Sequence, residues 1–459
     1  MLRWNDVSLF RPIDLREPEV GSLYDVVVVG GGPAGSIAAT VLAERGWSVL
    51  VLERATFPRF HIGESLLTYM PALFDRLGIG DSLLGADFPV KSGAEFCEGD
   101  GTFRRLDFAD QGAGRRQTTY QVERSEFDRR LVERARRAGA VVVQEARVHT
   151  VLVDEEDRVR GVAYEHRGLE RRVSARQVLD ASGRAGVISN QWLRARRMNE
   201  RLKQVALFRH YDRVDERTNP GTEGDIQIGS HDGGWVWAIP IGTGRLSVGA
   251  VTTPACVRQG PSAEALFDDH VGRVPRIAQR LTGAAAATGV MRESNFCYYT
   301  EALSGSGFLV LGDAGCFVDP IFSAGVFLAV ATGARAAELT SEVLSGRAPE
   351  ADVNEAYARF YKTGYDCYFR LIYAFYEYGF RLNHFLRSTG VRVHPSWVTR
   401  LLNGDFWSRK NPLANHLRAI GRYDTFRSFE PLFGCPVYPE LEAREPGFPS
   451  LQRGDCGSE

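Results

Sequence analysis

The sequence predicts an α/β protein in which a Rossmann-like domain, discontinuous along the chain, holds an inserted β-sheet domain and precedes a mainly helical C-terminal region. Three observations predict this class. Residues 24–53 have the pattern of a buried strand, a glycine turn, a helix and a second strand. Residues 200–295 are mostly β in pattern, and residues 307–315 repeat the strand-then-glycine form before a long apolar helix.

The composition excludes several classes of protein. The 459 residues are 44% hydrophobic and 25% charged, as in a soluble globular protein with more than one lobe. Lys+Arg 56 and Asp+Glu 57 give a net charge of -1, so no overall field favours nucleic acid or an anionic membrane. The seven cysteines form no C-x-x-C pair, which argues against disulfides and a metal site and favours a reducing cytoplasm. Because no apolar run reaches about 18 residues, we expect neither export nor membrane insertion.

The first βαβ unit contains a dinucleotide-binding fingerprint. Its G-x-G-x-x-G follows a strand and opens a helix, and an acidic residue ends the next strand. The glycines allow a tight turn, close approach of a pyrophosphate and close packing of the helix, whose N-terminus offers N–H donors. This pattern predicts contacts to FAD or NAD from Gly30, Gly32, Pro33, Ala34, Gly35, Glu53 and Arg54.

Two further parts of the chain have clear local signals. A helix is expected over residues 125–140, with Ser125 as its N-cap and Gly139 at its end. Residues 233–240 and 245–251 are expected to pair as two strands around a turn, and the first strand is expected to stop at its Ile-Pro pair.

A second glycine element decides between the two dinucleotides. The GDAG at residues 312–315 follows an apolar strand and can bring Asp313 to another part of the same cofactor. A long two-ended ligand such as FAD needs this, whereas an ordinary NAD dehydrogenase does not. A helix is then expected over residues 323–344, and an aromatic helix covers residues 365–380. We interpret that aromatic stretch as buried between domains; a substrate channel and a docking site for a carrier are the alternatives.

These elements predict three regions. We expect the FAD-binding domain at 22–95, 118–195 and 296–345, the β-sheet substrate domain at 96–117 and 196–295, and the helical, aromatic-rich region at 346–459.

The chain then resembles a known family. The fingerprint, the GDAG with the following DPIFSAG, and the Gln and Arg of YQVERSEFD resemble the FAD-binding domain of aromatic-hydroxylase-like flavoproteins. FPRFHIGESLL at 57–67 and the W-x-W-x-I-P within GGWVWAIP are similar to flavin-dependent halogenases, in the branch that acts on phenols and pyrroles, often tethered to a carrier protein. The resemblance implies further FAD contacts from Gln121, Arg124, Asp313, Pro320 and Gly325.

Two tryptophans stand out in the GGWVWAIP segment. Because strand residues two apart share a face, Trp235 and Trp237 point together and Val236 points away. The resemblance implies a wall that keeps the substrate from the flavin C4a-hydroperoxide, so that only a halide reaches it and hypohalous acid forms. Core packing of the sheet is the alternative.

The resemblance also implies a lysine and a halide site. VKSGAEF is similar to the segment holding the halogenase lysine, which makes Lys91 the predicted catalytic residue among only four lysines. An amine can lose its proton and accept a halogen, whereas a guanidinium cannot; a solvated surface lysine is the alternative. Ser323, Ala324 and Gly325 match the halide position, where backbone N–H groups can hold an anion. Phe322 stands where the tryptophan-halogenase branch has a glutamate, which favours phenols or pyrroles over indoles.

Other polar residues near these motifs receive lesser roles. Glu64 and Ser65 match a motif near the flavin, but such a pair at a helix start is more often a cap. His61 is expected to pack beside the flavin and not to act as a base.

The expected activity is FADH2-dependent halogenation, with chloride before bromide, of an electron-rich aromatic ring in antibiotic or other natural-product biosynthesis. It needs O2, a separate flavin reductase and an aromatic small molecule, free or tethered to a carrier protein. A flavin-dependent aromatic monooxygenase, that is a hydroxylase, is the main alternative, and halide dependence distinguishes it. A reductase of isoprenoid double bonds and a flavin-binding protein without turnover are the others.

Overall fold

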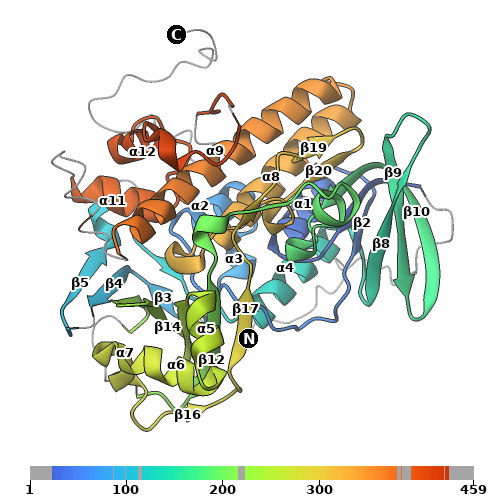
Figure 1. Ribbon diagram of the computed structural model, residues 1–459. Coiled ribbons are helices and arrows are strands. Elements are labelled where there is room, and N and C mark those ends of the chain that lie inside the picture. The colour runs from blue at the N-terminus through green and yellow to red at the C-terminus, as the bar shows by residue number, and fades with distance from the viewer. Residues whose placement is uncertain are drawn as a thin grey trace, which may run out of the picture.

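A computed structural model describes residues 23–433 except 86, 99, 112–115, 216–222, 380–383, 385–393 and 428. Phe380 of the aromatic stretch and the end of the predicted C-terminal region lie outside the described residues. Two large sheets and the helices around them form the described part, with the helical C-terminal region above both sheets in Figure 1. The predicted α/β class is confirmed.

The first sheet is the nucleotide-binding sheet. Four of its neighbouring pairs are parallel, which requires the helical crossovers that the sequence pattern indicates. Its path runs β19-β20-β10-β1-β2-β7, with β8 and β9 joined to β10. The strands are β1 (Leu23–Val29), β2 (Val49–Leu52), β7 (Val141–Val143), β8 (Ala146–Val153), β9 (Val159–His166), β10 (Leu169–Asp180), β19 (Ser304–Gly305) and β20 (Phe308–Val310).

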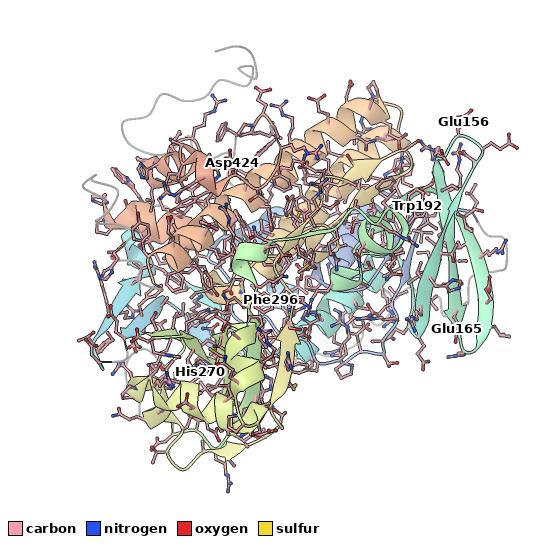
Figure 2. The ribbon with its side chains drawn as sticks, viewed as in Figure 1. Glu156, Glu165, Trp192, His270, Phe296 and Asp424 are labelled. Atoms are coloured by element: carbon pink, nitrogen blue, oxygen red, sulfur yellow. The ribbon has the colours of Figure 1, made fainter. Side chains whose placement is uncertain are left out.

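The antiparallel strands β8 and β9 extend this sheet together with the first half of β10. They form an arm at one side of the molecule (Figure 1). Glu156 and Glu165 lie on this arm, far from the second sheet (Figure 2), and both are exposed.

The second sheet is largely antiparallel, with one parallel pair between β13 and β4. Its path runs β16-β12-β15-β14-β13-β4-β5, and β17 pairs with β12. The strands are β4 (Gly93–Glu98), β5 (Phe103–Asp107), β12 (Val205–Asp212), β13 (Ile226–His231), β14 (Gly234–Gly242), β15 (Arg245–Thr252), β16 (Ala285–Ala286) and β17 (Met291–Ser294). Two small ladders join β3 (Val90–Lys91) to β6 (Thr119–Tyr120) and β11 (Arg197–Met198) to β18 (Tyr298–Tyr299).

The helices cover both sheets. In the described residues they are α1 (Pro33–Glu44), α2 (Tyr69–Arg76), α3 (Gly80–Leu83), α4 (Arg124–Ala138), α5 (Pro254–Gln259), α6 (Ala263–Gly272), α7 (Pro275–Arg280), α8 (Gly325–Leu344), α9 (Glu350–Glu377), α11 (Pro395–Leu402) and α12 (Pro412–Arg418). Helices α6 and α7 cover one face of the second sheet, and the other face belongs to the large core shared with α1, α8 and α9.

Three local predictions need correction. Helix α4 ends at Gly139 with φ +108° as expected, but its N-cap is Glu123, so the predicted Ser125 cap is wrong. Strand β14 continues through Pro240 to Gly242 because the proline lies beyond the last residue paired with β13, where its missing N–H breaks no ladder on that side. The boundary predicted between residues 95 and 96 falls inside β4.

A cross-strand row on the inner face of the second sheet explains how the large indoles fit. Phe96, Ile228, Trp237, Gly249 and Phe208 follow one another across five strands. Trp237 lies over the glycine of β15, where an added Cβ would sit 2.2 Å from the indole carbons. The absence of a side chain at Gly249 therefore makes room for the ring.

The described helices include none with the length and apolar character needed to cross a membrane. The five cysteines in the described ranges are free, and no His, Cys, Asp or Glu cluster there could hold a metal ion.

Gly249→Ala should lower the free energy of unfolding by about 1–3 kcal/mol, because the new methyl group overlaps the indole of Trp237. Gly272→Ala is the matched control: an added Cβ meets nothing within 4 Å there, so the change should stay within about 0.5 kcal/mol. Urea unfolding of both variants gives the comparison, and equal stabilities would contradict the tight fit.

Candidate functional site

The first glycine turn is shaped by close backbone contacts. Gly30 has φ +102°, and a Cβ there would lie 2.4 Å from the Ala181 carbonyl oxygen. A Cβ on Gly35 would lie 2.0 Å from the carbonyl oxygen of Gly30. Helix α1 therefore starts directly against the turn, and its Gly32 N-cap supplies no side-chain partner for the first N–H groups. Free N–H groups at a helix N-terminus suit an anion such as a pyrophosphate.

Glu53 holds this turn from the end of β2. Its carboxylate accepts hydrogen bonds from the Gly31 N–H at 2.8 Å and the Ala55 N–H at 2.9 Å. Glu53 is 5% exposed, whereas its neighbour Arg54 is exposed. The structure thus places the predicted glycines and Glu53 together, and Arg54 at the surface beside them.

Arg124 and Gln121 come from the start of α4 and the strand before it. The Arg124 guanidinium bonds both carboxylate oxygens of Asp128, at 2.8 and 3.0 Å, and donates to the Ile62 carbonyl at 2.8 Å. Burial alone would raise the pKa of Asp128, but the Arg124 charge holds it below its usual value. Gln121 donates its amide to the Gly224 carbonyl at 2.9 Å, and its buried carbonyl oxygen has no hydrogen bond within the described ranges.

The second glycine element lies at the carboxyl end of β20. Gly312 has φ +51°. The following Asp313 is half-buried, and desolvation of its carboxyl group raises its pKa to about 6 against the opposing charge of Arg124. A half-buried acid, an orphaned amide oxygen at Gln121 and an open helix N-terminus fit a two-ended dinucleotide. The residues present therefore fit FAD, with the α1 N-terminus suited to its pyrophosphate.

Lys91 lies in a second part of the site. It is 2% exposed, and its Nζ donates to the Ser65 hydroxyl at 2.9 Å and to the Leu66 carbonyl at 3.1 Å. Burial lowers the pKa of Lys91 from 10.5 to about 7, while the charge of Asp225 opposes this shift. The alternative of a solvated surface lysine is wrong.

Lys91 lines a pocket of about 300 Å³, including its mouth, which we call the Lys91 pocket. Its walls are otherwise apolar except for one serine, and none of the twelve described lining residues is acidic. The lining residues are Leu67, Lys91, Ala94, Phe96, Leu106, Phe108, Ile226, Ile228, Ile321, Phe322, Ser323 and Leu402.

The halide turn, residues 319–325, forms another wall of this pocket. Pro320–Phe322 make a 3-10 turn, Ser323 has φ +60°, and Ala324 is the N-cap of α8. Phe322 and Ser323 both line the pocket, so the structure brings the predicted lysine and the start of the predicted halide site together. A helix N-terminus without a side-chain cap, beside a pocket lined by a buried amine, is suited to an anion.

The tryptophan wall, Trp235 and Trp237, lies beside the Lys91 pocket without lining it. Both indoles face the same side as predicted, with ring centroids 5.7 Å apart and exposures of 1% and 4%. Ile228, which lines the pocket, is the direct cross-strand neighbour of Trp237. The indoles therefore continue the apolar surface on which the pocket is built.

Glu64 was underestimated from the sequence. It caps no helix, since α2 begins only at Tyr69. Its buried carboxylate instead lies 2.7 Å from the Nε2 of His210, a buried residue of β12. Sequence reasoning missed His210, for which strand alternation with Phe208 was the only signal. His61, in contrast, is exposed.

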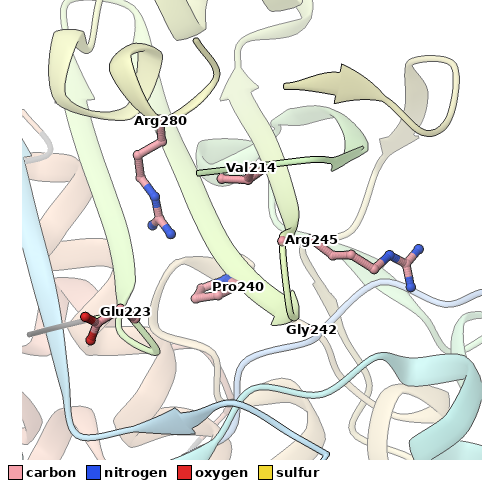
Figure 3. Close-up of a pocket in the computed structure, with 7 residues that line it drawn as sticks. Val214, Glu223, Pro240, Gly242, Arg245 and Arg280 are labelled. Atoms are coloured by element: carbon pink, nitrogen blue, oxygen red, sulfur yellow. The ribbon is translucent and has the colours of Figure 1, made fainter. Parts of the chain in front are cut away.

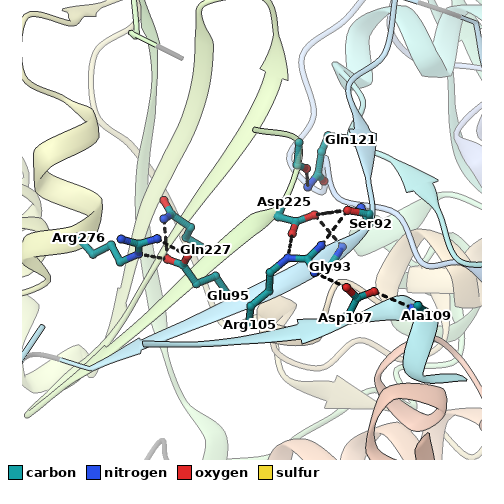
Figure 4. A network of polar contacts seen from close by, with 11 residues as sticks. Ser92, Gly93, Glu95, Arg105, Asp107, Ala109, Gln121, Asp225, Gln227 and Arg276 are labelled. Atoms are coloured by element: carbon teal, nitrogen blue, oxygen red, sulfur yellow. Dashed lines mark hydrogen bonds and ion pairs between the residues drawn. The ribbon is translucent and has the colours of Figure 1, made fainter. Parts of the chain in front are cut away.

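A polar network fixes the backbone that follows Lys91 (Figure 4). Asp225 accepts hydrogen bonds from the Ser92 N–H at 3.0 Å, the Gly93 N–H at 2.7 Å and the Arg105 Nε at 2.8 Å. The negative charge of Asp225 thereby holds the end of β3, and the lysine on it, against the second sheet.

Another pocket lies at the end of β14, with a volume of about 250 Å³ (Figure 3). Its arginines already have partners: Arg245 bonds Asp212 and Glu123, and Arg280 bonds Gln227. We assign no chemistry to it. The lining residues are Val214, Glu223, Pro240, Gly242, Gly244, Arg245 and Arg280.

Comparison with known proteins decides the family. The model of the tryptophan halogenase family matches residues 25–110 and 103–389. The chain belongs to this family. The tryptophan 2-halogenase of Chondromyces crocatus is 32% identical over 375 residues, which cover 78% of this chain and 69% of that protein.

Solved halogenase structures share the fold. The flavin-dependent brominase Bmp2 has a TM-score of 0.78 at 30% identity, over 88% of this chain and 99% of Bmp2. The myxobacterial chondrochloren halogenase CndH has a TM-score of 0.72 at 32% identity, over 77% of this chain and 83% of CndH. The protein is thus a flavin-dependent halogenase, an oxidoreductase of aromatic substrates that uses FAD as FADH2 and a halide. Family membership favours halogenation over the hydroxylase, the isoprenoid reductase and the inert flavin carrier.

Lys91→Met should stabilise the protein most at and below pH 7. Since the pKa of Lys91 falls from 10.5 to about 7 on folding, the folded state loses a proton that the unfolded state keeps as the pH rises between these values. Wild-type stability should therefore rise with pH relative to Lys91→Met over this range, and the difference should be constant below it. Urea unfolding from pH 6 to 10 measures this, with the exposed Lys203→Met as control. A pH-independent difference would contradict the shift.

Glu53→Gln should weaken FAD binding about tenfold, because the charged acceptor of the Gly31 and Ala55 N–H groups is lost and the turn loosens. Flavin fluorescence titration gives the dissociation constant. Glu342→Gln, on the exposed end of α8, is the control and should leave it unchanged. Equal constants in the two variants would remove Glu53 from the cofactor site.

Proposed function

We propose that this halogenase chlorinates an electron-rich phenol or pyrrole ring in natural-product biosynthesis, with Lys91 as the catalytic amine. The observation that supports this most strongly is the buried Lys91 amine within an apolar pocket that also contains the halide turn. The apolar walls of this pocket suit a neutral aromatic ring.

The missing acid supports the choice of ring. Phe322 occupies the position of the tryptophan-halogenase glutamate, and no carboxylate lines the pocket among the described residues. A phenol or pyrrole is activated by its own heteroatom and needs less help in losing its ring proton after electrophilic attack. An indole without such help reacts more slowly.

Bound FADH2 would supply the two electrons that reduce O2 to the peroxide level, and this oxidant would convert the halide into hypohalous acid. The residues of the chain then direct that product. Lys91, whose pKa lies near 7, is partly neutral at physiological pH and can displace water from hypohalous acid to form a haloamine. Transfer of the halogen breaks the nitrogen–halogen bond and forms the carbon–halogen bond, and the proton that the ring carbon loses restores the amine. Ser65 and Leu66 orient the amine by accepting its hydrogen bonds.

The tryptophan wall supplies selectivity in this proposal. Two adjacent buried indoles separate the substrate from the flavin, so that the ring meets halogen and not oxygen. The halide lies beside Ser323, Ala324 and Gly325 at the N-terminus of α8, where the first N–H groups of the helix can face an anion; the Ser323 N–H itself donates to the Pro320 carbonyl at 2.9 Å. A separate flavin reductase provides FADH2, and the substrate is presented free or on a carrier protein.

The direct test is mass spectrometry of reactions with FAD, NADH, a flavin reductase, O2 and a panel of phenols and pyrroles, free and carrier-loaded, with chloride, bromide or neither. The expected result is a product with the isotope pattern of chlorine, formed only with chloride. Lys91→Ala should lower its rate by about 100-fold or more, because the amine acts in the reaction. Lys203→Ala is the matched control.

Three outcomes would contradict parts of the proposal. Faster bromination than chlorination at equal halide would replace chloride by bromide. Preference for an indole would remove the argument from Phe322. A gain of oxygen that is indifferent to halide and to Lys91 would mean that the tryptophan wall does not exclude the substrate and that the protein hydroxylates it.

A further inference from the structure

Helix α9 contacts residues 310–319, which contain the GDAG element and the start of the halide turn, through a series of tyrosines that we call the tyrosine ladder. Each hydroxyl donates to residues 310–319, and most of the acceptors are backbone carbonyl groups. The ladder consists of Tyr357 to Val310, Tyr361 to Gly312, Tyr365 to Phe317 (shared with the Tyr298 carbonyl), Tyr368 to Asp319 and Tyr376 to the Asp319 carboxylate. These hydroxyls explain much of the aromatic crowding on α9, and none of the five lines the Lys91 pocket.

The last two tyrosines reach the halide turn. The Tyr368 hydroxyl lies 2.9 Å from the Asp319 carbonyl oxygen and 3.5 Å from the Ala324 nitrogen, so it contacts both ends of the turn. The Tyr376 hydroxyl donates to the Asp319 carboxylate, whose other oxygen accepts the Ile321 N–H at 3.0 Å. The side chain of Asp319 thereby shapes the turn from within, and Tyr376 holds that side chain.

Tyr376 has a second partner on the other side. Its hydroxyl accepts a hydrogen bond from the Trp235 indole Nε1 at 3.0 Å. One phenol oxygen therefore connects the tryptophan wall to the halide turn. Trp235 is 1% exposed, so its indole N–H would be an unsatisfied buried donor without this oxygen.

The halide turn needs such support. Ser323 adopts φ +60°, a left-handed conformation that is uncommon for a residue other than glycine, and the contacts around it must maintain this shape. Asp319 is 1% exposed, so the loss of a donor to its carboxylate is not made good by solvent.

We propose that Tyr376 is a positioning residue that sets halide binding and substrate exclusion together, by holding the halide turn and the tryptophan wall through one hydroxyl group. The inference rests on the proposed function, since it concerns the same halide and the same wall. Tyr376 itself touches neither the Lys91 amine nor the pocket.

The test compares Tyr376→Phe with Tyr357→Phe in the FAD-loaded enzyme. Both changes remove one hydroxyl from the same helix, but Tyr357 bonds Val310, before the GDAG element and away from the halide turn. Chloride is titrated against the absorbance of oxidised FAD, which gives a dissociation constant without turnover. The loss of a hydrogen bond to a buried carboxyl group predicts about tenfold weaker chloride binding in Tyr376→Phe and no change in Tyr357→Phe.

Kinetics separate positioning from general damage. In Tyr376→Phe the KM for chloride should rise about tenfold, kcat at saturating chloride should change less than about twofold, and the share of oxygenated product should increase. Tyr357→Phe should lower Tm by a similar amount without either effect. If both variants lose the same stability and keep the wild-type chloride constant, Tyr376 is only a packing residue and the inference is overturned.

The outcomes also separate this inference from the proposed function. If the wild type makes no halide-dependent product, the proposed function fails whatever the variants do. If the wild type halogenates and Tyr376→Phe matches Tyr357→Phe in every measurement, only the inference fails. Should Tyr376→Phe not fold, Tyr368→Phe removes the neighbouring hydroxyl from the same turn and decides by the same titration.

Discussion

The backbone contact between α1 and α8 determines where the parts of the site lie. A Cβ on Gly333 would sit 2.4 Å from the carbonyl oxygen of Ala34, so the two helices approach more closely than larger side chains allow. Residues almost 300 positions apart are thereby joined, and the N-terminus of α8 comes to the same side of the molecule as the N-terminus of α1. Both ends offer N–H groups, one suited to a pyrophosphate and the other to a halide.

The second sheet supplies apolar surroundings for the Lys91 amine. Its inner face is apolar where it borders the Lys91 pocket, whereas Glu95 and Gln227 on the other face bond each other, and Glu95 also bonds Arg276 of α7 (Figure 4). An amine in such surroundings is stripped of water, which is why its proton is held weakly. The same apolar surroundings keep water from competing for an electrophile held on the amine.

Much of the fold was predictable because local rules specify it. Glycines at fixed spacing, a buried strand and a helix start define the first unit, and strand alternation correctly put Trp235 and Trp237 on one face. Lys91 came from resemblance, and its burial could not have been read from a short segment without a clear strand or helix period. His210 and Tyr376 were out of reach for another reason. Each acquires its partner, Glu64 or Asp319, from a segment far away in the chain, so no spacing within the sequence reports the contact.

The tyrosine ladder has a consequence for how the chain tolerates change. A hydroxyl that bonds a carbonyl oxygen is indifferent to the side chain on that residue, since every residue type presents the same acceptor. Four of the ladder's contacts are of this kind. Exchanging the side chains of Val310, Phe317 and their neighbours therefore leaves the acceptors of these hydrogen bonds from α9 in place. Asp319 is the exception, because the hydrogen bond from Tyr376 needs its side-chain carboxyl group. The ladder therefore depends on the residue type at one position only, Asp319, and that position belongs to the halide turn.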